Sequence, residues 1–206
     1  MLDDATTRII VGFVEAATVD LARLRRTGEV QSEDHITSRL IDRIRVQVDD
    51  LKVNGIRWSA VETVSQGKDS QERATGADLL AVLRIDVPPV TLTKGFLAQA
   101  KILQPGIDLE DLKRQCNAML HYTPDAYAWL YDETGVWVAP AITVASANPP
   151  AVPTLQSLGG FFDMHLRSWI GDRKFTASTR DQLEALRGDF RARRALMLDA
   201  EFESSE

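Results

Sequence analysis

The chain has 206 residues, of which 44% are hydrophobic and 26% are charged, and its formal net charge is −6. This composition is typical of a globular domain, no apolar run is long enough to span a membrane, and the amino-terminal stretch lacks the basic start of a signal peptide, so a cytoplasmic location is expected. The single cysteine, Cys116, excludes an intrachain disulfide and, with three scattered histidines, a Cys/His zinc cage.

Apolar residues at helical spacing predict two helices at the start of the chain. The first covers about residues 4–26 and ends before Gly28, and the second begins after Ser32, which is a suitable N-cap. The stretch "IRWSAVETV" (56–64) is rich in β-branched and aromatic residues, which predicts a strand. The polar stretch 65–76 is expected to form a loop.

Two apolar strands and a helix are expected next. Residues 77–87 are apolar on both faces, as in a central strand, and a turn through Lys94–Gly95 leads into a second strand at 96–103. Asp108 can cap a third helix. Two further strands, at 126–131 and 136–145, flank the turn "DETG".

The remainder is expected to be a Pro-rich connector followed by helical segments at about 155–170 and 179–200. The order through residue 131, which is helix, helix, strand, strand, strand, helix, strand, predicts an α/β sandwich with a mixed sheet and helices on both faces. Residues 1–146 would form the core with an amino-terminal helix, and residues 147–206 would pack on the same domain.

Polar residues interrupt the second apolar strand at one face. Gln99 and Lys101 lie one residue apart, so their side chains point the same way, and burying both costs several kcal/mol unless they are satisfied. Asp78 opens the preceding strand, and a tight connection would make the two strands antiparallel neighbours. A carboxylate, an amide oxygen and a backbone carbonyl are ligands that Mg²⁺ accepts, and a lysine can orient an attacking water.

"GAD" followed 21 residues later by "QAK" resembles the PD-(D/E)xK nuclease superfamily, in the Gln variant of Mrr-like nucleases. The resemblance covers residues 32–131 and implies a restriction-endonuclease-like αβββαβ core, with extra N- and C-terminal helices. It implies that Asp78, Gln99 and the Ala100 carbonyl bind metal and that Lys101 positions water. An acidic residue of the first core helix often joins them, and the candidate here is Glu33, with Glu62 and Glu72 as weaker substitutes. No proline precedes Asp78 and Gln99 carries no charge, which are departures from the usual pattern.

The activity that the resemblance implies is a Mg²⁺-dependent DNA endonuclease, with Mn²⁺ as a substitute. The substrate would be double-stranded DNA cut with little sequence preference, a homodimer or a targeting protein could assist, and antiviral defence would be consistent. RNA is a further possible substrate. The alternative function is a catalytically inactive binding or assembly subunit of the same fold, whose acidic surface meets a protein partner. The alternative for the single residues is structural: Asp78 would bond a turn at the start of its strand, and Gln99 and Lys101 would lie on a sheet face open to solvent.

The residues expected to contact nucleic acid are Lys94, Arg173, Lys174 and Arg191. Seven basic residues against four acidic ones lie between Asp172 and Arg194. Such a segment can bind phosphates, or it can be a solvated helix face with ion pairs one turn apart.

Overall fold

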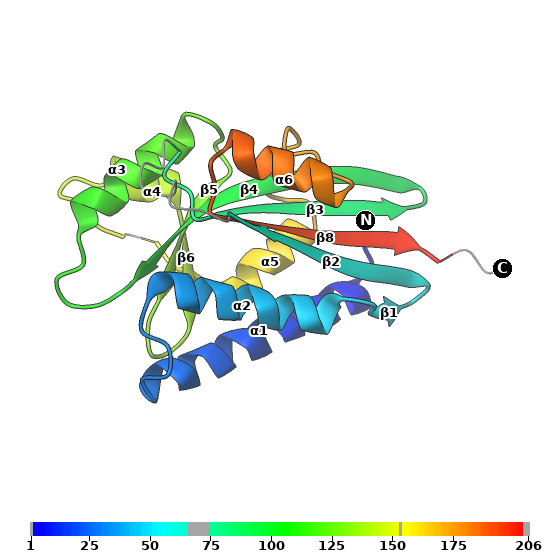
Figure 1. Ribbon diagram of the computed structural model, residues 1–206, viewed down its shortest axis with the longest axis horizontal. Coiled ribbons are helices and arrows are strands. Elements are labelled where there is room, and N and C mark those ends of the chain that lie inside the picture. Colours follow the sequence, from blue (N-terminus) through cyan, green and yellow to red (C-terminus); the bar gives the residue numbers. More distant parts are fainter. Residues whose placement is uncertain (1, 66–74, 153, 204–206) are drawn as a thin grey trace.

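The computed structural model describes residues 2–65, 75–152 and 154–203, so most of the loop expected at 65–76 lies outside the described ranges. Within them the chain forms six helices and one eight-stranded sheet (Figure 1). The elements in chain order are α1 (Asp4–Arg26), α2 (Glu33–Val48), β1 (Lys52–Val53), β2 (Ile56–Val64), β3 (Leu79–Val87), β4 (Val90–Ile102), α3 (Leu109–Leu120), β5 (Ala126–Tyr131), β6 (Val136–Pro140), α4 (Ala141–Ser146), β7 (Gln156–Ser157), α5 (Leu158–Leu166), α6 (Arg180–Asp189) and β8 (Arg194–Phe202).

Side-chain caps fix the starts of the second and third helices. The Ser32 hydroxyl accepts a hydrogen bond from the His35 N–H at 3.3 Å, and the Asp108 carboxylate accepts one from the Asp111 N–H at 2.8 Å. Each side chain satisfies an N–H group that has no acceptor within its own helix. The predicted starts of α2 and α3 are therefore confirmed.

The sheet is mixed, with the strand order β1-β2-β8-β3-β4-β5-β6-β7. β3 and β4 are antiparallel neighbours, whereas β4 and β5 run parallel and are connected through α3. Parallel neighbours need such a crossover because a short turn can join only antiparallel strands. The predicted α/β class and the mixed sheet are confirmed.

The last strand, β8, lies in the middle of the sheet, where the sequence predicted a helix over residues 179–200. α6 ends at Asp189, and β8 then pairs parallel to β3 and antiparallel to β2. All residues from Arg194 to Ala200 are buried. A strand covered on both faces lacks the alternation of polar and apolar residues that marks a half-buried strand. The helix prediction was therefore wrong beyond Asp189, and the C-terminal segment completes the sheet.

The strand predicted over 136–145 is also too long. β6 ends at Pro140, and the short helix α4 follows it directly. Ala141 and Val144 of this helix are buried in the same cluster as Cys116 of α3. The apolar run therefore combines a strand and a buried helical turn, which apolar periodicity over so few residues does not distinguish.

The turn between β3 and β4 is formed by Pro88–Pro89, not by Lys94–Gly95 as predicted. β4 begins at Val90, so Lys94 and Gly95 lie inside the strand. A Cβ atom at Gly95 would lie 2.3 Å from the Ala81 carbonyl oxygen of β3. This glycine therefore permits a close approach of two backbones, which is a common reason for glycine inside a strand.

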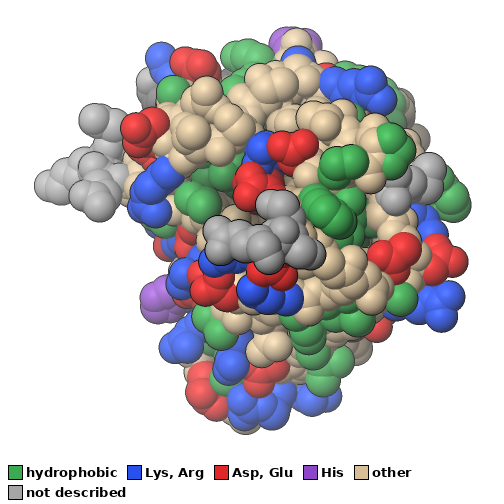
Figure 2. Space-filling view, turned by 90° about the vertical axis from the view of Figure 1, so that its right-hand side faces the viewer, with side chains coloured by type: hydrophobic (Ala, Val, Ile, Leu, Met, Phe, Trp, Pro, Cys, Tyr) green, Lys and Arg blue, Asp and Glu red, His purple; other side chains and the backbone are tan. Residues whose placement is uncertain are grey.

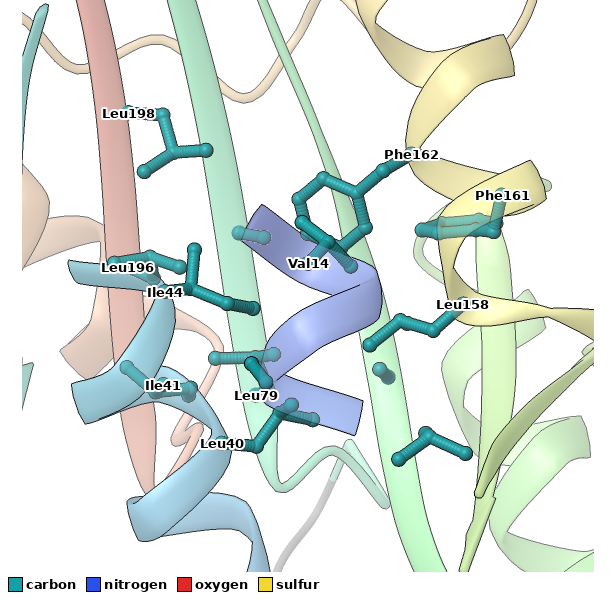
Figure 3. Close-up of a cluster of buried hydrophobic side chains, with 14 of the residues drawn as sticks. Val14, Leu40, Ile41, Ile44, Leu79, Leu158, Phe161, Phe162, Leu196 and Leu198 are labelled. Carbon is teal, nitrogen blue, oxygen red and sulfur yellow. The ribbon is translucent and has the colours of Figure 1, made fainter. Parts of the chain in front are cut away.

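Helices cover both faces of the sheet (Figure 1). α1, α2 and α5 pack on one face, in a cluster that includes Val14 of α1, Ile44 of α2, Phe162 of α5 and Leu196 of β8 (Figure 3). α3, α4 and α6 pack on the opposite face, in a second cluster that includes Met119. The burial of apolar side chains on both faces positions the strands that carry the candidate site.

Basic and acidic side chains are interspersed on the face shown in Figure 2. Among the ion pairs of the described residues, Arg84 of β3 contacts Asp86 at 2.7 Å and Asp199 of β8 at 2.9 Å. Opposite charges that are paired in this way partly cancel each other's electrostatic field.

Candidate functional site

The candidate site lies where β4 extends beyond the start of β3. β3 begins at Leu79, opposite Ala98, so residues 99–102 of β4 pair with β5 alone. Successive residues of a strand direct their N–H groups to opposite edges. The N–H groups of Ala100 and Ile102 therefore face an edge that no strand of the described chain covers.

Two carboxylates accept the hydrogen bonds of these backbone N–H groups, as the carbonyl oxygens of a neighbouring strand would do. The Asp78 Oδ2 atom accepts a hydrogen bond from the Ala100 N–H at 3.0 Å, and the Glu33 Oε1 atom accepts one from the Ile102 N–H at 3.1 Å. Asp78 stands one residue before β3, and its own N–H extends the ladder by donating to the Ala98 carbonyl at 2.9 Å. The structure thus brings two of the predicted acidic residues to the same edge of β4.

Gln99 contacts Asp78 directly. Its Nε2 atom donates to Asp78 Oδ2 at 2.6 Å and to the Ala100 carbonyl oxygen at 3.1 Å. Gln99 is 1% exposed and Asp78 is 8% exposed, so this contact is made away from water. The Gln99 Oε1 atom is buried and has no hydrogen-bond partner among the described residues. Such an oxygen is a candidate for contact with a ligand, here because it belongs to the same amide that contacts Asp78 and Ala100.

A small hollow lies beside these groups. Its volume is roughly 10 Å³, which is about the space of one water molecule. Six residues of α2, of the start of β8 and of the positions just before β3 and β8 line it: Glu33, Asp34, Thr37, Asp78, Arg193 and Arg194. In this conformation the hollow is too small for a nucleotide.

Arg194 is a residue of this hollow that the sequence analysis did not place, because it expected a helix there. The guanidinium donates to Glu62 Oε1 at 3.0 Å and to Asp34 Oδ1 at 3.2 Å, and the backbone N–H donates to the Asp78 carbonyl oxygen at 3.0 Å. Arg193 also contacts Asp34, at 2.7 Å. Burial raises the pKa of Glu62, although the bond from Arg194 opposes the shift. Arg194 of β8 and the preceding residue Arg193 therefore place two cations beside the predicted carboxylates.

Lys101 points to the same face as Gln99, as predicted, but its ammonium is held by α3. The Lys101 Nζ atom lies 3.2 Å from Asp111 Oδ2, and Arg114 also contacts this carboxylate. Burial alone would raise the pKa of Asp111, but the bonds from Lys101 and Arg114 lower it below its ordinary value. Asp111 was not singled out from the sequence, although its place in the first turn of the helix after β4 brings it over that strand.

The buried phenol of Tyr131 lies near the Asp78 and Glu33 carboxylates. It is on the face of the sheet that α2 covers, opposite to the side chains of Gln99 and Lys101. The Tyr131 hydroxyl lies 2.9 Å from the Thr37 hydroxyl of α2. Burial raises the pKa of Tyr131, and the negative charges of Asp78 and Glu33 add to that shift. Tyr131 is therefore a neutral hydrogen-bonding group at neutral pH.

Lys94 does not lie on a nucleic-acid surface, contrary to prediction. It is 2% exposed, and its ammonium donates to the carbonyl oxygens of His165 and Ile170, the latter at 2.7 Å. Burial lowers the pKa of Lys94 to about 8. The ammonium satisfies two backbone oxygens at the end of α5 and is structural.

The other predicted contacts are exposed. Lys174 lies 3.4 Å from the Asp172 carboxylate and its Nζ atom lies 5.4 Å from the centroid of the Phe175 ring. Arg173 and Arg191 are exposed as well, and Arg191 follows α6 with a positive φ of 47° instead of lying on a helix. These three side chains remain accessible to a ligand.

The donor set at the edge of β4 suits a hard cation. Asp78 offers a carboxylate, Ala100 a carbonyl and Gln99 an amide oxygen that no described residue contacts by a hydrogen bond, and Mg²⁺ prefers oxygen ligands of these kinds. Residues 2–65, 75–152 and 154–203 contain no group of three His, Cys, Asp or Glu side chains placed to hold a metal. Glu72, a weaker predicted substitute, lies outside the described residues. Any site here would therefore rely on neutral oxygens beside one or two carboxylates.

No family model matches the chain, and no curated protein or solved structure shows significant similarity to it. Among the described helices, none has both the length and the apolar character needed to cross a bilayer.

Proposed function

We propose that the protein is a Mg²⁺-dependent DNA endonuclease that hydrolyses phosphodiester bonds. The observation that carries the proposal is the meeting of Asp78, Gln99 and the Ala100 carbonyl at the edge of β4 that no described strand covers, where the buried Gln99 amide oxygen has no partner among the described residues. Buried polar atoms without partners are candidates for ligand contacts. This is the constellation that the resemblance to the PD-(D/E)xK superfamily predicts.

Each residue would have a separate role. Asp78, Gln99 and the Ala100 carbonyl would hold Mg²⁺, and Glu33 would supply a second negative charge from α2. The bound cation would supply a Lewis acid that stabilises charge on the phosphate. Lys101 would orient the water that attacks phosphorus, as one P–O bond breaks and leaves a phosphate monoester and a hydroxyl. For this role the Lys101 ammonium has to break its contact with the Asp111 carboxylate and form a hydrogen bond to the attacking water instead.

The arrangement of elements supports a restriction-endonuclease-like core. The order α2-β2-β3-β4-α3-β5 is the αβββαβ order, with Asp78 before its second strand and Gln99 on its third. β8 separates β2 from β3 and is an insertion relative to that core. The same insertion brings Arg193 and Arg194 beside the carboxylates, where cations favour an approaching phosphate.

The proposed substrate is double-stranded DNA, bound with little sequence preference. Arg173, Lys174 and Arg191 are exposed and would contact phosphates, which carry no sequence information. A homodimer or a targeting protein would bring two strands or a chosen site to the enzyme. A role in defence against foreign DNA is consistent with such an activity.

A second candidate function is a catalytically inactive assembly subunit of the same fold. Two contacts favour it, because Gln99 places an amide nitrogen beside Asp78 and Asp111 holds the Lys101 ammonium. In this alternative the polar groups satisfy one another and stabilise the fold. The partner would then be a protein.

Plasmid cleavage in Mg²⁺, Mn²⁺ or EDTA separates the two functions. The endonuclease predicts cleavage that requires the cation and is lost in Asp78→Asn and Lys101→Ala. Asp86→Asn, at the opposite end of β3, is the matched control and should cut normally. A single-stranded DNA and an RNA of the same sequence test the substrate class.

Cleavage that survives Asp78→Asn or Lys101→Ala contradicts the assignment of the site. If the wild-type protein neither cuts any of these nucleic acids nor binds a divalent cation, the assembly function is favoured instead.

A further inference from the structure

The Gln99 amide directs its nitrogen, and not its oxygen, between two acceptor oxygens. Nε2 lies 2.6 Å from Asp78 Oδ2 and 3.1 Å from the Ala100 carbonyl oxygen. At the other end of the amide, Oε1 is buried without a hydrogen-bond partner among the described residues. The side chain thus satisfies two neighbours while its own oxygen remains unsatisfied.

The chemistry of the neighbouring atoms explains this orientation of the amide. A carboxylate and a carbonyl can only accept hydrogen bonds, so a donor between them is favourable. The reverse orientation would place the Gln99 oxygen against two other oxygens, which repel one another unless a positive charge lies between them. A divalent cation reverses the preference, because it binds oxygens and repels an N–H group.

We propose that the side-chain amide of Gln99 has two orientations and rotates by a half-turn when a divalent cation binds. Without the cation, Nε2 occupies the place between Asp78 and Ala100 and closes the site. With the cation, a half-turn of the amide brings Oε1 to the oxygens of Asp78 and Ala100 and carries Nε2 to the position that Oε1 now holds. The inference rests on the metal site of the proposed function. It adds that the Gln99 Nε2 group competes with the cation for the place between the oxygens of Asp78 and Ala100.

The competition predicts a distinctive effect of Gln99→Glu. A carboxylate cannot donate a hydrogen bond to Asp78, so the internal competitor is lost and a second negative charge is gained. Affinity for Mg²⁺ should rise at least about tenfold, which corresponds to roughly 1.4 kcal/mol. The cation-free variant should melt at a lower temperature than the wild type, since two buried carboxylates then repel. Added Mg²⁺ should recover more of that stability in the variant than it adds to the wild type.

The experiment combines calorimetric Mg²⁺ titration with the side-chain NH₂ signal of Gln99 in ¹⁵N-labelled full-length protein. The signal is identified by its absence in Gln99→Glu. Gln47→Glu, at an exposed position near the end of α2, adds the same charge away from the site and is the matched control. Asp78→Asn should abolish both the binding and the spectral change.

Three results are possible. A saturable shift of the Gln99 signal with Mg²⁺ supports the inference, as does tighter binding by Gln99→Glu but not by Gln47→Glu. Binding that Asp78→Asn abolishes, without any change of the Gln99 signal, overturns the rotation of the amide and leaves the metal site intact. No cation binding by the wild type or by Gln99→Glu overturns the proposed function together with this inference. The wild-type spectrum decides the question even if Gln99→Glu does not fold.

Discussion

Asp78 and Glu33 accept hydrogen bonds from alternate N–H groups on one edge of β4, although they come from different elements and are 45 residues apart in the sequence. These N–H groups belong to Ala100 and Ile102, which lie beyond the end of β3. Backbone donors in a protein interior need acceptors, and here side chains supply them. The candidate ligands therefore also terminate the β3–β4 pairing.

This dual role predicts that removal of the Asp78 carboxylate destabilises the fold. Asp78→Ala removes the acceptor of the buried Ala100 N–H and one of the two acceptors of the Gln99 amide, and such losses cost about 1–3 kcal/mol each. We expect the free energy of unfolding to fall by at least about 2 kcal/mol in urea denaturation. Asp78→Asn, which keeps an acceptor oxygen, should lose less.

The control is Asp86→Ala at the other end of β3. Its carboxylate is 44% exposed and pairs with Arg84, and exposed pairs contribute about 0–1 kcal/mol. Equal losses for Asp78→Ala and Asp86→Ala would contradict the structural role of Asp78.

A second prediction concerns the ion pair between Lys101 and Asp111. The two side chains are 18% and 24% exposed, so Asp111→Asn should cost about 0.5–1 kcal/mol at neutral pH. Because the pKa of Asp111 is lowered in the folded protein, its contribution is present above the ordinary carboxyl pKa of about 4 and is lost as the pH falls through the lowered value. Urea denaturation at several pH values should show the difference from wild type vanishing in acid.

The neighbouring substitution Glu110→Gln is the control for Asp111→Asn, since Glu110 is exposed in the same helical turn. A stability difference for Asp111→Asn that stays constant down to about pH 2 would exclude the ion pair as its cause.

The contact between Asp78 and Gln99 was predictable because it is local. Two apolar strands joined by a short turn pair with each other, and alternation then places Gln99 and Lys101 on one face. The caps at Ser32 and Asp108 were predictable for the same reason, since each acts within one helical turn.

The position of β8 was not predictable in this way. Its sequence, "RALMLDAEF", is rich in Ala, Leu, Met and Glu, which favour helices. It forms a strand because β2 and β3, more than 100 residues earlier, provide hydrogen-bonding edges on both sides. Strand preference depends on such neighbours more than helix preference does. Arg194 could be assigned to the candidate site only after this strand was placed.

The third prediction follows from Arg194, which connects α2, β2 and β8 through Asp34 and Glu62. Arg194→Met leaves Glu62, whose side chain is 13% exposed, without its cation, whereas Asp34 keeps its contact with Arg193. Loss of one partner of a fully buried pair costs about 3–5 kcal/mol, and for this partly buried pair we expect about 1–3 kcal/mol. Thermal or urea denaturation should register this loss, and the double variant Arg194→Met/Glu62→Gln should recover part of it. No recovery in the double variant would show that the two side chains are not coupled.

The fourth prediction concerns the buried Lys94, whose ammonium is shielded from water and bonded to the His165 and Ile170 carbonyl oxygens. Burial lowers its pKa to about 8, with Asp125 opposing and Arg173 reinforcing the shift. Between about pH 8 and the ordinary lysine pKa near 10.4, the unfolded chain holds a proton that the folded chain has released, so the free energy of unfolding rises with pH. Relative to Lys94→Met, which keeps the volume without the charge, the wild type should gain up to about 3 kcal/mol across this range in urea denaturation. If the free energies of unfolding of the wild type and of Lys94→Met changed equally with pH, the folded protein would lose the Lys94 proton at the same pH as the unfolded chain, which would contradict the prediction.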